Sequence, residues 1–151
     1  MRIWVDADAC PVVIKEILYR AATRVSAELI LVANQALKTP PSPVIRSVRV
    51  PHGFDAADRY IASAVEAGDL VVTADVPLAA QVVARGGFAL NPRGELYTDD
   101  NVSEHLARRD LLDELRGLGM VSGGPAPFSA TDKREFANKL DALLSRAMRA
   151  K

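Results

Sequence analysis

The sequence has little cysteine, little histidine and no net charge, and each shortage excludes a class of protein. Its single cysteine, Cys10, has no partner for an internal disulfide, so a reducing cytoplasm is the expected location. The two histidines, His52 and His105, do not have the spacing of a zinc site. The 19 basic residues equal the 19 acidic residues in number, so no overall positive field attracts nucleic acid.

Long apolar runs are also missing. No segment approaches the roughly 20 residues of a membrane span, and the charges at Arg2 and Asp6 come too early for a signal peptide. No membrane partner is therefore expected. An apolar fraction of 49% over 151 residues is ordinary for a globular protein with a proper core. We expect one domain over residues 1–151 with a C-terminal helical extension from about residue 100, in an oligomeric state that the pattern leaves open.

Charge is unevenly distributed along the chain. Up to Ala107 there are 10 basic and 13 acidic residues, and from Arg108 onward there are 9 basic and 6 acidic residues. An acidic body with a mildly basic tail suits a metal site beside a phosphate-binding surface. Solvated helix faces are the simpler explanation of the same pattern.

Short apolar runs alternate with segments of helical spacing, which is typical of parallel α/β architecture. The pattern predicts a three-layer α/β/α sandwich with a mostly parallel central sheet. Proline-rich and glycine-rich segments at 38–43 and 117–129 predict loops, and Asn91 to Gly94 predict a turn. The predicted strands are 3–5, 29–33, 46–50, 70–73 and 88–90, and the predicted helices are 12–24, 56–67, 77–85, 102–116 and 129–148.

Aspartates follow the predicted strands. Asp6 and Asp8 come after the first strand, and Asp75 follows the strand that ends at Thr73. Ligands in open parallel sheets bind beyond the carboxyl ends of the strands, so these acids are expected at one edge. Asp55 and Asp58 lie three residues apart at the start of the helix predicted at 56–67, and they can share a face of that helix.

Carboxylates gathered in this way repel each other, by roughly 4 kcal/mol for one pair at 4 Å and an effective dielectric of 20. No Lys or Arg lies within 5–10 or 71–82 to neutralise them locally. An all-oxygen ligand set favours Mg²⁺ or Mn²⁺ over zinc. Helix capping is the alternative explanation for any one of these aspartates, although a charge at the end of a buried strand, as at Asp6, is costly without a partner.

Long and unusual motifs over nearly the whole chain resemble the YaiI/YqxD family of uncharacterised bacterial proteins. The resemblance implies a fold related to PIN domains, a class that contains metal-dependent ribonucleases. The motifs are Trp4-Val5-Asp6-Ala7-Asp8-Ala9-Cys10-Pro11-Val12, Gly53-Phe54-Asp55-Ala56-Ala57-Asp58, Thr73-Ala74-Asp75-Val76-Pro77-Leu78-Ala79, Asn91-Pro92-Arg93-Gly94, Arg109-Asp110, Glu114-Leu115-Arg116 and Gly124-Pro125 to Phe128.

The resemblance to PIN domains implies roles for individual acids. Asp6 resembles the acid after the first strand, Asp58 the acid that opens the central helix, and Asp75 the acid after the following strand. These three are the expected catalytic residues, and Asp8 and Asp55 are expected to complete the metal site. The fourth acid of PIN domains is absent from 76–78, and Asp8, Asp55 or Asp99 is the acid expected to take its place if the site is catalytic.

Four residues outside the acidic group are predicted to contact substrate. Asn34 and Lys38 follow the second strand, Thr73 ends another strand, and Arg93 lies in the predicted turn; side chains of these types hold phosphate or position water. Cys10 before Pro11 is expected to be a small packing residue, with a reactive thiol as the alternative.

Three functions agree with these residues. The first is a PIN-like phosphodiesterase that cleaves RNA or single-stranded nucleic acid with Mg²⁺ or Mn²⁺. The second is a metal- or RNA-binding regulatory module without turnover, which the missing fourth acid favours. The third is a phosphatase of haloacid-dehalogenase type with Asp6 as nucleophile and Asp8 as general acid, although Pro11 leaves no room for the flap that usually follows that motif.

Overall fold

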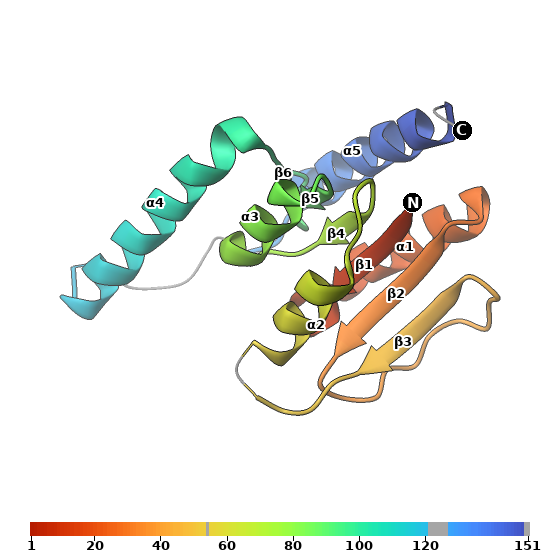
Figure 1. The fold of residues 1–151 in the computed structure, drawn as a ribbon, viewed down its shortest axis with the longest axis horizontal. Coiled ribbons are helices and arrows are strands. Elements are labelled where there is room, and N and C mark those ends of the chain that lie inside the picture. The colour runs from red at the N-terminus through yellow and green to blue at the C-terminus, as the bar shows by residue number, and fades with distance from the viewer. Residues whose placement is uncertain (54, 121–126, 150–151) are drawn as a thin grey trace.

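The structure is a computed structural model and describes residues 1–53, 55–120 and 127–149. Its centre is a six-stranded sheet in the order β3-β2-β1-β4-β5-β6 (Figure 1). The strands are β1 (Arg2–Asp6), β2 (Glu28–Ala33), β3 (Ile45–Arg49), β4 (Leu70–Val72), β5 (Phe88–Leu90) and β6 (Leu96–Tyr97).

All neighbouring strands are parallel except β5 and β6, which are antiparallel. The chain builds outward from β1 through β2 to β3, then returns to the other side of β1 and builds outward through β4 and β5. The strand order therefore reverses between β1 and β4. In open α/β sheets the crevice at this reversal is where ligands bind.

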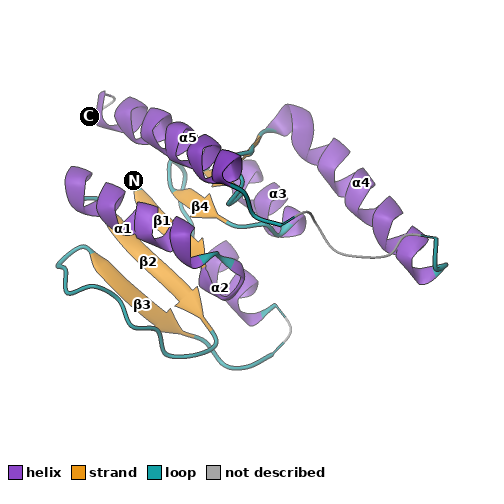
Figure 2. Cartoon of the chain, turned by 180° about the vertical axis from the view of Figure 1, so that it is seen from behind, coloured by secondary structure: helices purple, strands orange, loops and turns teal. Residues whose placement is uncertain are grey.

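Helices cover both faces of the sheet, so the predicted three-layer α/β/α sandwich is confirmed. Helices α1 and α5 lie on one face and α2 and α3 on the other (Figures 1 and 2). The helices are α1 (Val12–Val25), α2 (Ala56–Ala64), α3 (Val76–Ala84), α4 (Asp99–Gly117) and α5 (Ala130–Arg149), with a short 3₁₀ turn at Ala7–Ala9.

Strand alternation decides which side chains reach which layer. In β1, Ile3 and Val5 pack toward α1 and α5, whereas Trp4 packs toward α2 and α3. In β4, Val71 joins Trp4 on the α2–α3 side. Because side chains two residues apart share a face of a strand, the next residues on this side are Asp6 and Thr73.

The turn between β5 and β6 lies directly against α5. Gly94 has φ +92°, and a Cβ at this position would come within 2.6–2.7 Å of backbone and side-chain atoms of Glu135 and Phe136. Only glycine combines this backbone conformation with so close an approach. The Arg93 guanidinium also donates to Asp132 of α5 at 2.7 Å, so a predicted phosphate-binding residue is engaged in joining two elements.

Helix α4 differs from the others because none of its residues is buried. It contacts α3 and extends away from the body of the molecule (Figure 1). The apolar side chains of Leu111, Leu118 and Met120 are exposed on and just after it.

The structure differs from the sequence-based prediction by more than one residue in three places. Helix α2 ends at Ala64 and not at 67, because Val65 is extended. Strand β6 is absent from the prediction because a two-residue strand has no periodicity to detect. Helix α4 begins at Asp99 and not near 102, because Thr98 and Asn101 form a capping box that starts it earlier. The capping pair of Ser129 and Asp132 at the start of α5 is confirmed. Of the predicted loop at 117–129, residues 121–126 lie outside the described residues.

Across the three described stretches of the chain, no helix combines the length and the apolar character that a membrane span requires.

Candidate metal centre

Three carboxylates meet where the strand order reverses. Asp55 directly precedes α2, Asp58 lies in the first turn of α2, and Asp75 directly precedes α3. One carboxylate oxygen from each of the three lies within 4.8 Å of the others. Oxygens at this separation can coordinate the same divalent cation, whose ligand distances are about 2.0–2.6 Å.

Asp6 reaches the same place from the end of β1. Its Oδ2 accepts a hydrogen bond from the Thr73 hydroxyl at 3.3 Å, and Thr73 Oγ1 in turn accepts from the backbone N–H of Asp75 at 3.0 Å. The Thr73 side chain therefore links the ends of β1 and β4. Thr73 is only 1% exposed, so the structure gives it a positioning role within the site and no open surface for substrate.

The electrostatics of the group reflect the crowding of negative charge. Burial, the charges of Asp75 and Asp6, a hydrogen bond shared with Asp75 and the charge of Asp55 raise the pKa of Asp58 to about 7. Burial also raises the pKa of Asp6, with Asp75 and Asp8 adding to the rise, while the hydrogen bond from Thr73 opposes it. Both shifts disfavour the charged carboxylates that a cation would stabilise.

Capping explains some of these aspartates and not others. Asp75 Oδ1 accepts from the backbone N–H of Leu78 at 2.8 Å and caps α3. Asp8 Oδ2 accepts from the backbone N–H of Asn34 at 2.9 Å. Asp55 occupies the N-cap position of α2 but makes no capping hydrogen bond, and its backbone is left-handed with φ 61°. Its carboxylate therefore has no part in holding the helix end.

No cation of the described chain neutralises the group. Within residues 1–53, 55–120 and 127–149, no Lys, Arg or His forms an ion pair with Asp6, Asp55, Asp58 or Asp75. An all-carboxylate set of this kind fits the oxygen preference of Mg²⁺ or Mn²⁺.

Two cavities share Asp55 and Asp58. The smaller, of about 150 Å³, lies over the ends of β1 and β2 and is also lined by Asp6, Asp8 and Asn34. The larger, of about 580 Å³, runs along α2 and α3 to α4 and also includes Asp75. The acidic cluster thus lies where the two cavities meet.

The remaining predicted site residues lie elsewhere. Asp99 is exposed in the first turn of α4, and Lys38 is exposed in the loop after β2; neither lines the two cavities. Cys10 is buried, and burial raises the pKa of its thiol to about 12. A thiol with that pKa stays protonated, which agrees with the expected packing role.

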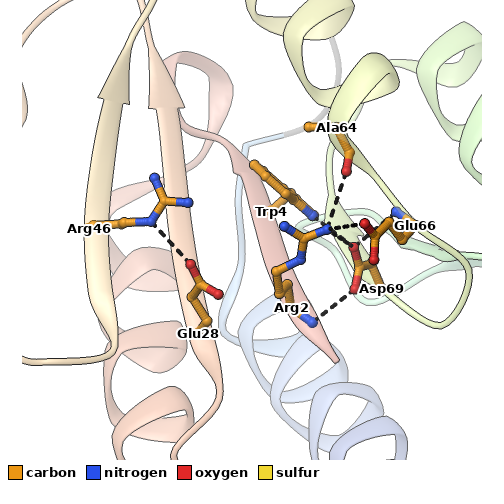
Figure 3. A network of polar contacts seen from close by, with 7 residues as sticks. All are labelled: Arg2, Trp4, Glu28, Arg46, Ala64, Glu66 and Asp69. Atoms are coloured by element: carbon orange, nitrogen blue, oxygen red, sulfur yellow. Dashed lines mark hydrogen bonds and ion pairs between the residues drawn. The ribbon is translucent and has the colours of Figure 1, made fainter.

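The sequence-based prediction did not single out Asp69, which directly precedes β4 at the end of the strands opposite the acidic cluster. It is 5% exposed and accepts hydrogen bonds from the Arg2 and Glu66 backbone N–H groups, both at 3.0 Å, and from Trp4 Nε1 at 3.1 Å (Figure 3). The Arg2 guanidinium lies 3.4 Å from it. Asp69 directly precedes a predicted strand, which is the only signal the sequence carries for it.

Fold and site together define an α/β protein with a carboxylate cluster at the reversal point of a mostly parallel sheet. The chain belongs to the YaiI/YqxD family, described as uncharacterized, whose pattern matches residues 4–146. It is 62% identical to a UPF0178 protein of Bordetella avium over 97% of this chain and 95% of that one. It is also 57% identical to a UPF0178 protein of Hahella chejuensis over 99% and 100% of the two chains. No solved structure matches the chain at a significant level.

Proposed function

We propose that this protein is a PIN-like, Mg²⁺- or Mn²⁺-dependent phosphodiesterase that acts on RNA or single-stranded nucleic acid in the cytoplasm. The observation that carries the proposal is the convergence of Asp55, Asp58 and Asp75 within 4.8 Å, beside Asp6 and without a neutralising side chain among the described residues. A divalent cation bound to such a cluster polarises phosphoryl oxygens and lowers the pKa of water.

In this proposal the aspartates bind the cation and Thr73 positions them. Asp55, Asp58 and Asp75 would hold the cation from the starts of α2 and α3, with Asp6 beside them at the end of β1 and Asp8 at the rim. Because Asp58 has a pKa near 7, cation binding there displaces a proton. Thr73 keeps Asp6 and the start of α3 in register through its two hydrogen bonds.

A cleavage assay tests the proposal. Purified protein is incubated with a panel of single-stranded and structured RNAs in Mg²⁺, Mn²⁺ or EDTA, beside Asp58→Asn and Asp75→Asn. We expect metal-dependent cleavage by the wild type and a loss of at least a hundredfold in both variants. Asp99→Asn removes the same charge from an exposed position outside the cavities and should cleave at the wild-type rate. Absence of cleavage with every cation would count decisively against the phosphodiesterase.

A second candidate function is a metal- or RNA-binding regulatory module without turnover. The observation that favours it is the start of α3, where Val76, Pro77 and Leu78 occupy the segment in which PIN domains carry a fourth acid. Leu78 is 1% exposed and packs into the core, so no carboxylate can replace it there without loss of packing. Retention of RNA and metal without cleavage in the same assay would identify this function.

The phosphatase of haloacid-dehalogenase type has less support. Its general acid would be Asp8, whose Oδ2 is engaged with the Asn34 backbone N–H, and its nucleophile would be Asp6, whose raised pKa disfavours the nucleophilic carboxylate. Trapping of beryllofluoride on Asp6 would favour it over the phosphodiesterase.

A further inference from the structure

The two cavities that meet at the acidic cluster differ in charge: the smaller is acidic, and the larger contains carboxylates and arginines in equal number. The smaller is lined by carboxylates, and no Lys or Arg of the described chain contributes to it. The larger is lined by Arg59, Arg85 and Arg109 in addition to the cluster of Asp55, Asp58 and Asp75. Among the described residues, the arginines of these two cavities therefore all line the larger one.

The three arginines come from three different helices. Arg59 lies in α2, Arg85 ends α3, and Arg109 lies in α4. Helix α4 buries none of its residues, yet it contributes Arg109 to the larger cavity. Because α4 adds nothing to the buried core, its contribution of Arg109 to this cavity suggests a role in binding.

These guanidinium groups have few competing partners. Within the described residues, Arg59 and Arg85 make no side-chain hydrogen bond or ion pair. Arg109 pairs only with Asp110 at 3.3 Å and Asp113 at 3.9 Å on its own helix. Exposed pairs of this kind contribute little free energy, so an incoming anion replaces them readily. None of the three forms an ion pair with the acidic cluster in the same part of the chain.

We propose that the larger cavity binds the phosphates on one side of the scissile phosphate of a nucleic-acid strand, through Arg59, Arg85 and Arg109. This inference rests on the proposed function and gives its substrate a direction across the site. The cluster of Asp55, Asp58 and Asp75 holds the cation, and the smaller acidic cavity takes no phosphate without it. Guanidinium groups suit the bidentate recognition of phosphate oxygens.

The size and continuity of the cavity favour a strand over a free nucleotide. A volume of about 580 Å³ lies within the range of ligand sites. Because the two cavities share Asp55 and Asp58, a nucleic-acid strand in the larger cavity can continue past the cluster into the smaller one. A mononucleotide would use only one of the two cavities. Phosphate is the shared chemistry of both ligands, and the experiment separates them.

The test is equilibrium binding of a short fluorescein-labelled oligouridylate, followed by anisotropy in Ca²⁺ over about 50–200 mM salt, with the oligomer's intactness checked on gels. Arg59→Ala, Arg85→Ala and Arg109→Ala should each weaken binding about tenfold. The slope of log affinity against log salt should fall by about 0.7 for each lost phosphate contact. Arg85→Lys should keep the slope, since the charge remains.

Arg20→Ala is the matched control. Arg20 is exposed and lines a cavity between α1 and α5 on the other face of the sheet, so its loss changes net charge equally. Wild-type affinity and slope in the three cavity variants, or equal losses in Arg20→Ala, would overturn the proposal. Displacement of the oligomer by UMP at equal phosphate concentration would overturn it in favour of a nucleotide site.

Mn²⁺ calorimetry separates this inference from the proposed function. The three arginine variants should bind Mn²⁺ as the wild type does, because none of them is near enough to the carboxylates to pair with them. If the wild type does not bind Mn²⁺, but each arginine variant binds RNA more weakly than the wild type, the proposed phosphodiesterase is wrong and the phosphate-binding cavity is supported.

Discussion

The two ends of the parallel strands hold carboxylates in opposite ways. At the N-terminal end of β1, Asp69 accepts three hydrogen bonds from N–H groups and pairs with the Arg2 guanidinium (Figure 3). At the C-terminal end, Asp58 lies among other carboxylates and accepts no hydrogen bond from an N–H group of the described chain. Its partial burial, together with the charges of Asp75 and Asp6, raises its pKa to about 7.

The difference is the one expected between an acid that serves the fold and an acid that serves a ligand. A buried carboxylate that holds a fold together brings its own donors, because an uncompensated buried charge is costly. A carboxylate that lacks donors weakens the free protein and gains its partner from a ligand. Perturbed groups of the second kind concentrate at functional sites, so the comparison itself directs attention to the end that carries Asp6, Asp58 and Asp75.

The largest expected effect is at the end that carries Asp69. Asp69→Ala leaves Trp4 Nε1 and two backbone N–H groups without their acceptor, and should lower the free energy of unfolding by about 3 kcal/mol. Urea denaturation measures it. Asp141→Ala, which removes an exposed pair with Arg24, should cost less than about 1 kcal/mol. Equal losses in the two variants would erase the distinction drawn between the two ends.

The next effect is on metal affinity. Calorimetric titration with Mn²⁺ should show micromolar-to-millimolar binding by the wild type and at least tenfold weaker binding, about 1.4 kcal/mol, by Asp58→Asn and by Asp75→Asn. Asp6→Asn should behave in the same way, since Asp6 lies beside both. Asp99→Asn should leave the titration unchanged. Undiminished binding in all three cluster variants would place the cation elsewhere.

A smaller and opposite effect is expected on the stability of the metal-free protein. Since the folded pKa of Asp58 is near 7 and its ordinary value is 3.8, the folded state holds this proton more tightly than the unfolded state. The stability that this provides is complete below pH 3.8 and is lost as pH rises through about 7. Asp58→Asn should therefore raise the free energy of unfolding at pH 8, by on the order of 1 kcal/mol after allowance for solvent screening.

Thermal unfolding of wild type and Asp58→Asn between pH 5 and pH 8 tests this sign. The wild type should lose stability over that interval, and the variant should lose less. A variant that is less stable than the wild type at pH 8 would show that Asp58 serves the fold, as Asp69 does.

The smallest effect is expected at Asp8. Its side chain is exposed and one oxygen already accepts from the Asn34 backbone N–H. An asparagine keeps that acceptor, so Asp8→Asn should change Mn²⁺ affinity by less than about threefold and leave stability within about 0.5 kcal/mol of the wild type. A loss as large as that of Asp58→Asn would make Asp8 a ligand of equal rank.

The sequence predicts the layers of this fold well because its strands are strongly apolar and because Pro11 and Pro77 mark the starts of α1 and α3. Gly68 is a poorer guide, since α2 ends four residues before it. Periodicity reaches its limit at short or capped elements. Strand β6 has two residues, and the true start of α4 depends on a side-chain hydrogen bond between Thr98 and Asn101.

The site is predictable in part for the same reason. Acids that follow parallel strands share an edge, which places Asp6 and Asp75 together from sequence alone. The arginines of the larger cavity carry no such signal, because Arg59, Arg85 and Arg109 lie on three helices whose relative positions only the tertiary structure supplies. The sequence also carries no signal for the ion pair between Arg93 and Asp132, because the two residues are 39 positions apart and meet only when the turn after β5 packs against α5.

The position of α5 has a consequence for co-translational folding. The core on the side of β1 and α1 is completed by four residues of α5, Phe136, Leu140, Leu143 and Leu144. The first strand to be synthesised therefore packs against some of the last residues to be synthesised. Until they emerge, one face of the sheet stays half covered with apolar side chains exposed, the condition in which nascent chains aggregate or recruit chaperones. Synthesis of residues 136–144 is therefore the step at which the nascent chain can first close its core.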